Sequence, residues 1–285
     1  MSRMEGKHCL VTGATGGIGL VAARELARQG ASVTLVGRNP KKTQETVQAL
    51  RQELGSQAIQ GLVGDMSCMA DARRVAREYA ANNSRLDVLL NNAGAYFGTR
   101  MVTKDGYEMT FALNHLGYYA LTRDLLELLK RSAPSRVVNV SSGAQSLGRL
   151  NFDDLQQEQR FSGQQAYNNS KLANVMFTFE LARKLQGTGV TATCLHPGVV
   201  ATNFGKDNPT TFLKFLIAVA GPFMLTPEQG ADTPVWLASS PEADGLTGKY
   251  FVKRKERRVN RQAMDAAACA RLWEISEQLV NKAAH

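Results

Sequence analysis

The stretch KHCLVTGATGGIG, residues 7–19, decides the fold of this chain. Its first half, residues 7–12, is a short and mostly apolar run, which predicts a buried strand. Its second half is rich in glycine, with the spacing GxxxGxG rather than GxGxxG. Such glycines let the backbone turn tightly and approach a pyrophosphate at the start of the next helix. Because the turn follows the first predicted strand, we favour a dinucleotide site over an ordinary glycine-rich turn.

Outward from this stretch the chain alternates between strands and helices to its end. This alternation is typical of parallel βαβ units with right-handed crossovers. The sequence therefore predicts one α/β domain over residues 1–285, with a doubly wound, parallel, seven-stranded sheet flanked by helices. The predicted strands are 7–12, 32–36, 58–63, 86–90, 135–140, 190–196 and 248–252, and the predicted helices are 18–29, 41–54, 69–82, 107–130, 165–186, 227–239 and 261–282.

The composition is that of a globular protein: 285 residues, 44% of them hydrophobic, with a net charge of +9. The four cysteines have no metal or redox spacing, the start is too polar for a signal peptide, and no apolar run approaches the roughly 20 residues of a membrane span. We therefore expect a cytoplasmic protein without a metal. The basic residues are scattered apart from the run at 253–258, which we interpret as a solvated loop first and a phosphate or partner patch second. Because no aromatic residues interleave that run, we expect no nucleic-acid partner.

Small or polar residues follow one predicted strand after another. They are Asp65-Met66, Asn91-Asn92-Ala93-Gly94, Ser141-Ser142 and the segment that begins His196-Pro197-Gly198. Ligands of doubly wound sheets bind at the carboxyl ends of the strands. Any one segment could be turn chemistry alone, but so many at one edge indicate a ligand site.

The loop after the second predicted strand bears on the cofactor. It contains Arg38, Lys41 and Lys42 and no acidic residue at positions 36–40. An acidic residue here would bind the ribose of NAD, whereas an arginine accommodates the 2′-phosphate of NADP. A solvated basic loop is the alternative, but the position favours NADP.

Tyr167 and Lys171 stand four residues apart in a predicted helix, so both lie on one face of it. A cation beside a phenol favours the phenolate, and we expect Lys171 to lower the pKa of Tyr167 below its usual value near 10. The pair would then provide an acid/base group near neutral pH.

Taken together, these residues resemble the short-chain dehydrogenase/reductase family over essentially the whole chain. The resemblance is carried by Thr12-Gly13-x-x-x-Gly17-x-Gly19, Asp65, Asn91-Asn92-Ala93-Gly94, Asn114, Ser142, Tyr167-x-x-x-Lys171 and Pro197-Gly198. A finer resemblance, to the retinol dehydrogenase-like branch, is carried by residues 111–117, 136–142, 170–174 and 196–202. Two departures, a start close to the first strand and a basic tail after Val252, weigh against a retinoid as natural substrate.

The resemblance implies a Rossmann-type fold and an NADP(H)-dependent enzyme that interconverts a lipophilic aldehyde or ketone and its alcohol by hydride transfer. It implies four catalytic residues: Tyr167 exchanges a proton with the substrate oxygen, Lys171 assists it and holds the cofactor ribose, Ser142 binds the substrate oxygen, and Asn114 holds a relay water. The likeness selects Ser142 over Ser141. It places the cofactor on Gly13, Thr15, Gly17, Ile18, Gly19, Arg38, Asp65, Met66, Asn92, Ala93, Gly94, Tyr167, Lys171, Pro197, Gly198, Val200 and Thr202.

Two other functions stay open on the same frame: a non-catalytic NADP sensor that binds a partner, and a reductase of a tetrapyrrole pigment. The sensor is disfavoured by the retention of all four catalytic residues, Asn114, Ser142, Tyr167 and Lys171. His196 is expected to serve in packing at a strand end.

The family places a substrate loop at about 203–226. Its apolar segment 212–220 is interpreted as a lid over a lipophilic substrate, with a membrane-surface contact or a core-packed helix as alternatives. The helices that carry Asn114 and Tyr167 are apolar on more than one face, at Leu125, Leu128, Val175, Met176, Phe177 and Phe179, which suggests burial against a partner. The resemblance implies that this helix pair can form a homodimer interface.

Overall fold

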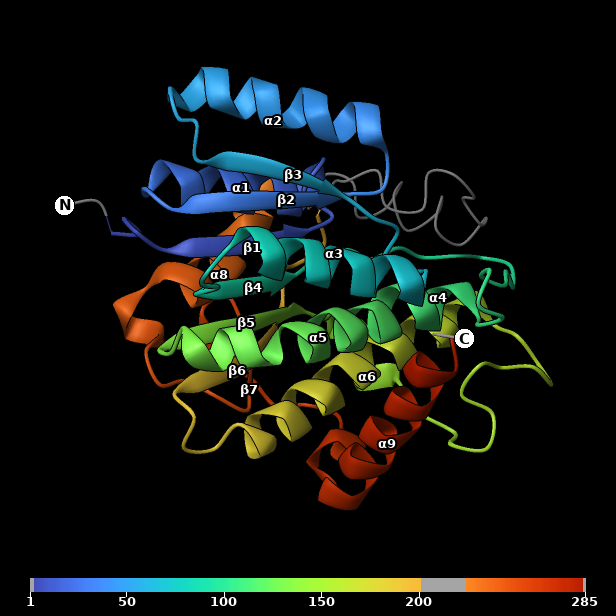
Figure 1. Ribbon diagram of the computed structural model, residues 1–285. Helices are drawn as coiled ribbons and strands as arrows, with labels where there is room; N and C mark the ends of the chain where they lie inside the picture. Colours follow the sequence, from blue (N-terminus) through green and yellow to red (C-terminus); the bar gives the residue numbers. More distant parts are fainter. Residues whose placement is uncertain (1–2, 201–223, 284–285) are drawn as a thin grey trace.

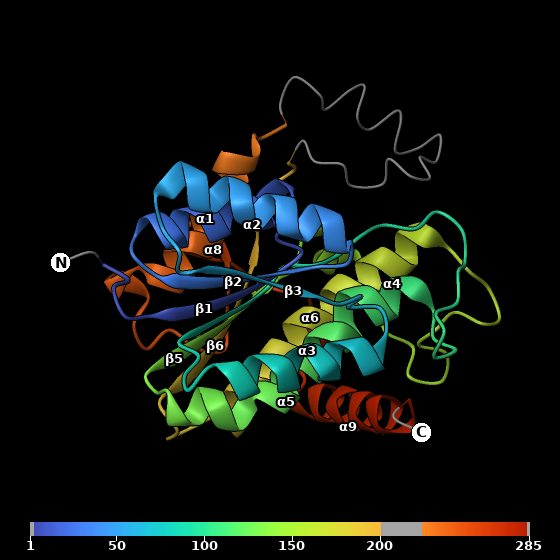
Figure 2. The same cartoon turned by 45° about the horizontal axis from the view of Figure 1, so that its top comes forward.

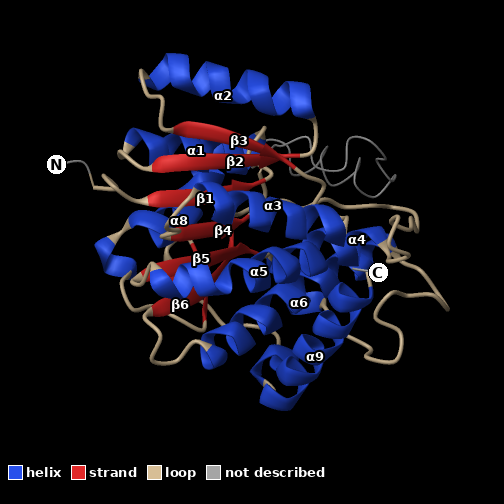
Figure 3. Ribbon diagram, viewed as in Figure 1, coloured by secondary structure: helices blue, strands red, loops and turns tan. Residues whose placement is uncertain are grey.

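A central sheet with helices on both faces forms the molecule (Figures 1 and 3). The computed structural model describes residues 3–200 and 224–283. Within these residues, seven strands run parallel in the order β3-β2-β1-β4-β5-β6-β7, and β8 pairs antiparallel with β7. The strands are β1 (His8–Thr12), β2 (Ser32–Gly37), β3 (Ile59–Val63), β4 (Val88–Asn91), β5 (Ser135–Val140), β6 (Val190–His196), β7 (Lys249–Val252) and β8 (Lys255–Glu256).

The helices form a layer on each face of the sheet, and Figure 2 separates the two layers. On one face lie α1 (Gly17–Arg28), α2 (Pro40–Leu54) and α8 (Pro227–Ser239). On the other lie α3 (Met69–Asn82), the three-residue α4 (Met109–Phe111), α5 (Gly117–Arg131) and α6 (Gly163–Lys184), with α9 (Ala266–Lys282) packed outside α5 and α6. Short 3-10 turns cover Gly143–Leu147, Pro241–Ala243 and Arg261–Met264.

Local sequence explains where several helices begin and end. The Asn39 side chain accepts a hydrogen bond from the Lys42 N–H and caps α2, with Pro40 in the first turn and Gly55 at a φ of 60° after the end. Helix α8 begins with a capping box between Thr226 and Gln229. Because the strands are covered on both faces, they are mostly apolar runs such as Val88–Leu90, with buried clusters on each side of the sheet.

The predicted doubly wound sheet is confirmed, and three details differ. The basic run at 253–258 is not simply a loop, because β8 turns back on β7 through Lys253 and Arg254, whose φ angles are 51° and 59°. The helix predicted at 107–130 contains a π-helical segment, Ala112–Leu116. The helix predicted at 261–282 divides at Asp265, whose side chain accepts hydrogen bonds from two N–H groups and starts α9.

Five of the six apolar residues that suggested a homodimer are buried within the chain, and the sixth, Phe179, is half-buried. Leu125 and Leu128 are buried where α5 packs against α3, and Val175, Met176 and Phe177 are buried on α6. Trp273 of α9 stacks on Phe177 with ring centroids 5.8 Å apart. The surplus of apolar residues therefore no longer argues for a partner, and the homodimer stays a prediction that rests on the resemblance.

Candidate active site

The order of the strands reverses between β1 and β4, and the loops after these two strands are tied together. The hydroxyl oxygen of Thr12 accepts hydrogen bonds from the N–H groups of Asn92, at 2.9 Å, and Ala93, at 3.0 Å. The Asn92 amide donates in turn to the Thr12 carbonyl at 2.9 Å. Asn92 therefore braces the glycine-rich turn with its side chain.

The glycines of this turn have no room for a side chain. Gly13 has a φ of 65°, and a Cβ there would lie 2.9 Å from the Cα of Ala93. A Cβ on Gly19 would lie 2.5 Å from the Gly13 carbonyl oxygen. Both clashes are with backbone, so larger residues would push the two loops apart.

The start of α1 offers donors to an anion. Gly16, the N-cap residue of α1, has no side chain to accept from the first N–H groups of the helix. The first turn of α1 also has no acidic residue. The ammonium of Lys42 reaches over this turn, 3.7 Å from where a Gly16 Cβ would stand. Arg38 is exposed at the end of β2, whereas Lys41 pairs with Glu45 at 3.9 Å. Free helix N–H groups with cations beside them fit the phosphates of a dinucleotide.

Asp65 and Met66 follow β3 at the same edge. One oxygen of Asp65 accepts hydrogen bonds from the Ser67 N–H, at 2.9 Å, and the Ser67 hydroxyl, at 2.8 Å. The Met66 side chain is buried in the core, and its carbonyl lies against Gly117 at the start of α5. The Met66 side chain is therefore not placed to meet a ligand.

The residues proposed for catalysis come together from β5 and α6. The Ser142 hydroxyl hydrogen-bonds the Tyr167 phenol, and the Lys171 ammonium lies 5.6 Å from the centre of the Tyr167 ring. Lys171 also donates to the Val140 carbonyl at 3.3 Å. Ser141 points elsewhere, since its hydroxyl donates to the Lys171 carbonyl at 2.7 Å. The structure thus brings Ser142, and not Ser141, to Tyr167.

The pKa of Tyr167 moves opposite to the expectation from its spacing to Lys171. Burial raises the pKa of the phenol to about 12, and the hydrogen bond with Ser142 only partly offsets this. Burial also lowers the pKa of Lys171 to about 8. The dominant effect is desolvation, which disfavours the charged form of both groups. Tyr167 therefore carries its proton at neutral pH.

Asn114 lies on the π-helical segment and is fully buried. Its side-chain oxygen accepts from the Ala95 N–H at 2.9 Å, and its amide donates to the Ala95 carbonyl at 2.9 Å and to the Ser170 hydroxyl at 3.0 Å. A Cβ on Gly94 would lie 3.0 Å from the Asn114 side-chain oxygen and 3.3 Å from the Lys171 ammonium. Asn114 therefore fixes the loop after β4 beside Lys171.

The segment after β6 completes the edge. Gly198 has a φ of 95°, and Leu225 fills the place where its side chain would be. A Cβ on Gly230 of α8 would lie 2.6 Å from Val200 and 3.2 Å from Ile18, so these two predicted cofactor residues meet at α8. Thr202 and the predicted lid at 212–220 lie outside the described residues. His196 packs beside Gly143, in keeping with its expected role.

The sequence did not single out Tyr96 or Ser170. Tyr96, after β4, lies edge-on to Tyr167 with ring centroids 6.0 Å apart. Ser170 links Asn114 to the Tyr167 carbonyl, to which its hydroxyl donates at 2.8 Å. Ser170 stands inside the Tyr167–Lys171 motif and could have been found there, but no pattern pointed to Tyr96.

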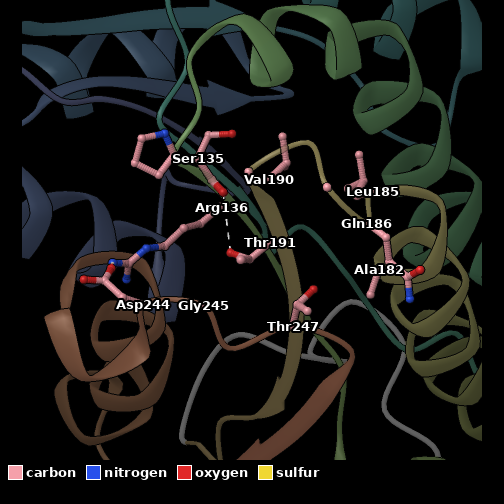
Figure 4. Close-up of a pocket in the computed structure, with 13 residues that line it drawn as sticks. Ser135, Arg136, Ala182, Leu185, Gln186, Val190, Thr191, Asp244, Gly245 and Thr247 are labelled. Atoms are coloured by element: carbon pink, nitrogen blue, oxygen red, sulfur yellow. Dashed lines mark hydrogen bonds and ion pairs between the residues drawn. The ribbon is translucent and has the colours of Figure 1, made fainter.

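The other edge of the sheet holds a cavity of about 500 Å³ that contains none of the predicted site residues (Figure 4). It lies where β5 and β6 begin, beside the end of α6. Over residues 3–200 and 224–283, no cluster of side chains suits a metal ion. Within the same ranges, no helix is both long and apolar enough to cross a membrane.

Comparison with known proteins adds to this geometry. Residues 7–211 match the family model described as short chain dehydrogenase. The chain is 44% identical to human retinol dehydrogenase 14 over 292 aligned positions, which cover 97% of this chain and 87% of that protein. A crystal structure of an uncharacterized protein from Mycobacterium paratuberculosis aligns with a TM-score of 0.79 and 33% identity, over 98% of this chain and 94% of the other. An active-site complex of Pseudomonas aeruginosa RhlG with NADP aligns with a TM-score of 0.71 and 28% identity, over 87% and 94%.

Proposed function

The chain belongs to the short-chain dehydrogenase family, and we propose that it is an NADP(H)-dependent reductase of lipophilic aldehydes or ketones with Tyr167 as general acid. Family membership makes it an oxidoreductase acting on C–OH and C=O groups. The observation that carries the finer proposal is the cluster of Ser142, Tyr167 and Lys171 at the carboxyl edge of the sheet. In this proposal residues 1–285 work as one catalytic domain.

The protonation states of the cluster support reduction. Reduced NADP, when bound, supplies the hydride. The Ser142 hydroxyl holds the substrate carbonyl oxygen, and Tyr167, protonated because its pKa is about 12, donates a proton to that oxygen. Lys171, with a pKa near 8, is largely charged at neutral pH and stabilises the phenolate that remains. The buried Asn114 keeps the neighbouring loop in place and, in the proposed relay, holds the water that returns the proton.

Three features support NADP as the cofactor. The uncapped start of α1 and the crowded glycines of its turn suit a pyrophosphate. Lys42 over that turn and Arg38 at the end of β2 add positive charge where an acidic residue would favour NAD. The similar protein RhlG was solved as a complex with NADP. The remaining contacts are assigned as in the sequence prediction, with Met66 acting through its backbone.

A lipophilic substrate is supported by Tyr96 and by the relatives. The Tyr96 ring stands edge-on to Tyr167 and forms an apolar wall beside the reacting group. The relatives named retinol dehydrogenase make retinal one candidate within this class. We propose the cytoplasm as the location, because Cys9, Cys68, Cys194 and Cys269 all remain free thiols.

The proposal is tested by following NADPH oxidation with a panel of aldehydes, ketones, retinals and quinones. We expect turnover that favours larger apolar carbonyl compounds. Turnover only of small polar compounds would contradict the substrate class. NADPH binding without any turnover would favour the sensor, and turnover confined to a tetrapyrrole would favour the pigment reductase.

Tyr96→Leu sharpens the substrate proposal. Leucine keeps an apolar side chain and loses the aromatic wall, so the KM of bulky substrates should rise about fivefold, a loss on the order of 1 kcal/mol of aromatic contact. The KM of a small aldehyde should change less than twofold, and Tyr96→Phe should resemble the parent. An equal rise in KM for small and bulky substrates would remove Tyr96 from the substrate wall.

A further inference from the structure

The π-helical segment Ala112–Leu116 interrupts the helix that leads into α5, and it carries Asn114 and His115, both fully buried. A π-turn is rare and tends to occur at functional sites. On the side of the active site, Asn114 binds Ala95 and Ser170. The question is what holds the segment from the opposite side.

His115 makes that second attachment. Its Nε2 lies 2.8 Å from the hydroxyl oxygen of Ser276 on α9. The Ser276 hydroxyl also lies 2.7 Å from the Leu272 carbonyl, which can only accept, so the hydroxyl proton points there. Nε2 must then carry the ring proton and donate it to Ser276. Burial lowers the pKa of His115 to about 3, so the ring is neutral and Nδ1 is an acceptor.

The Asn174 side chain stands beside both His115 and the carbonyl that Lys171 binds. The Asn174 side chain lies next to His115 and opposes the effect of burial on its pKa. Its amide donates at 3.4 Å to the Val140 carbonyl, which also accepts from Lys171 at 3.3 Å and from the Tyr118 hydroxyl at 3.5 Å. Three long hydrogen bonds thus share one acceptor, and a small shift of one donor changes the hydrogen bond that Lys171 donates to it.

We propose that His115 is a positioning residue: held by Ser276 of α9, it fixes the π-helical segment and thereby the place of Asn114 relative to Lys171. The inference rests on the catalytic roles proposed for Asn114 and Lys171. Over residues 3–200 and 224–283, α9 contributes no residue to the active site as described. In this proposal it nevertheless helps to hold that site in place. Misplacing a reacting group by about 1 Å can reduce turnover by up to about 10²-fold, so a support of this kind is measurable.

The chain offers a matched control in Ser132. Its hydroxyl also donates to the carbonyl four residues earlier, Leu128, at 2.7 Å, and accepts one further hydrogen bond, from the Leu86 N–H at 2.8 Å. Ser132 lies at the end of α5, away from the π-helical segment. Ser276→Ala and Ser132→Ala therefore each remove a buried hydroxyl with the same kind of partners.

We would measure kcat, the KM of NADPH, and Tm for both variants. Both should lower Tm by similar amounts, but only Ser276→Ala should lower kcat, by about tenfold. Ser276→Thr, which keeps the hydroxyl, should restore most of the loss. Equal kcat values in the two alanine variants would overturn the proposal, because the bond would then serve stability alone.

Two substitutions of His115 test which of its ring nitrogens makes the hydrogen bond to Ser276. The amide nitrogen of glutamine reaches about as far as Nε2, whereas that of asparagine reaches only as far as Nδ1. His115→Gln should keep most of the turnover and His115→Asn should lose about tenfold. The reverse order would overturn the assigned role of Ser276.

Two further measurements complete the test. Amide hydrogen exchange of the cofactor-free protein should speed up over residues 109–117 in Ser276→Ala and not in Ser132→Ala, and unchanged exchange there would overturn the proposal. Asn114→Ala distinguishes the catalytic role proposed for Asn114 from the positioning role proposed for His115. If it keeps the parent turnover, the catalytic role of Asn114 is wrong. If it loses turnover while Ser276→Ala does not, only the positioning role is wrong.

Discussion

The amino ends and the carboxyl ends of the strands, here called the amino edge and the carboxyl edge of the sheet, carry similar polar residues and use them differently. At the amino edge, around the cavity of Figure 4, the Arg136 guanidinium donates to the Leu237 and Ser240 carbonyls and pairs with Asp244. The Ser135 hydroxyl donates to the Leu129 carbonyl. Each of these groups is bonded within the chain and serves to join α8, α5 and the sheet.

At the carboxyl edge, burial disfavours the charged forms of the polar groups. Lys171 is buried with one long hydrogen bond at 3.3 Å, and burial shifts the pKa values of Lys171 and Tyr167 toward their neutral forms. Strongly shifted groups at the carboxyl ends of strands are typical of catalytic sites. In this molecule, therefore, shifted pKa values of buried polar groups, and not the presence of a cavity, distinguish the candidate active site.

The largest expected effect is that of Tyr167→Phe. The variant removes one phenol hydroxyl, so turnover should fall by about 10²-fold or more while NADPH affinity stays within a factor of about two. Tyr79→Phe is the matched control, since its buried hydroxyl binds the Arg85 carbonyl, away from the active site. That control should lose stability only. Parent-like turnover in Tyr167→Phe would remove the main distinction between the edges.

Arg38→Asp should reverse the preference for NADPH over NADH. A charge-assisted bond to the 2′-phosphate contributes roughly 1.5–3 kcal/mol, so NADPH affinity should fall about 10- to 150-fold. Lys41→Asp is the control, because Lys41 is highly exposed and faces Glu45. Titration of both cofactors checks this. Equal affinity of the parent for NADPH and NADH would refute the assignment.

The pH dependence of kcat should report the loss of the positive charge of Lys171. Its pKa of about 8 means that the charge that stabilises the phenolate is lost above that pH. Reductive kcat should therefore fall severalfold between pH 7 and 9. A flat profile over this range would show that the charge of Lys171 is not needed.

Stability should change in the opposite direction over the same window. The unfolded chain keeps Lys171 protonated up to its ordinary pKa near 10.4, whereas the folded chain releases the proton near 8. Between these values the unfolded state binds more protons, so this group adds stability as pH rises. The free energy of unfolding of the parent, relative to that of Lys171→Met, should therefore increase from pH 8 to 10. A decrease would contradict the lowered pKa.

The smallest effect is expected at the amino edge. Gln186→Trp places an aromatic ring at the rim of the cavity of Figure 4, where the glutamine is exposed. Kinetic constants should stay within a factor of about two of the parent, because no group there touches the reacting atoms. A large loss of turnover would mean that the two edges are coupled.

Much of the fold and the candidate site could be predicted, because both depend on local patterns. Apolar runs followed by small residues mark strands and their ends, and the relation of Tyr167 to Lys171 needs only the geometry of a helix. The pKa of Tyr167 could not be predicted, since spacing shows the neighbouring cation but not the burial that outweighs it. Nor could the cover of Phe177 by Trp273, because an apolar face does not reveal what packs against it.

The antiparallel turn from β7 into β8 has a consequence for the behaviour of the protein at high concentration. A bare edge of β7 would offer unpaired backbone groups to another molecule, which is a route to aggregation. Here β8 covers that edge with only two residues, Lys255 and Glu256, both charged and exposed. The left-handed turn at Lys253 and Arg254 brings β8 back along β7, so an incoming strand finds only a short ladder between charges. The opposite edge strand, β3, packs against α2. Resistance to edge-to-edge association is therefore built into both ends of the sheet.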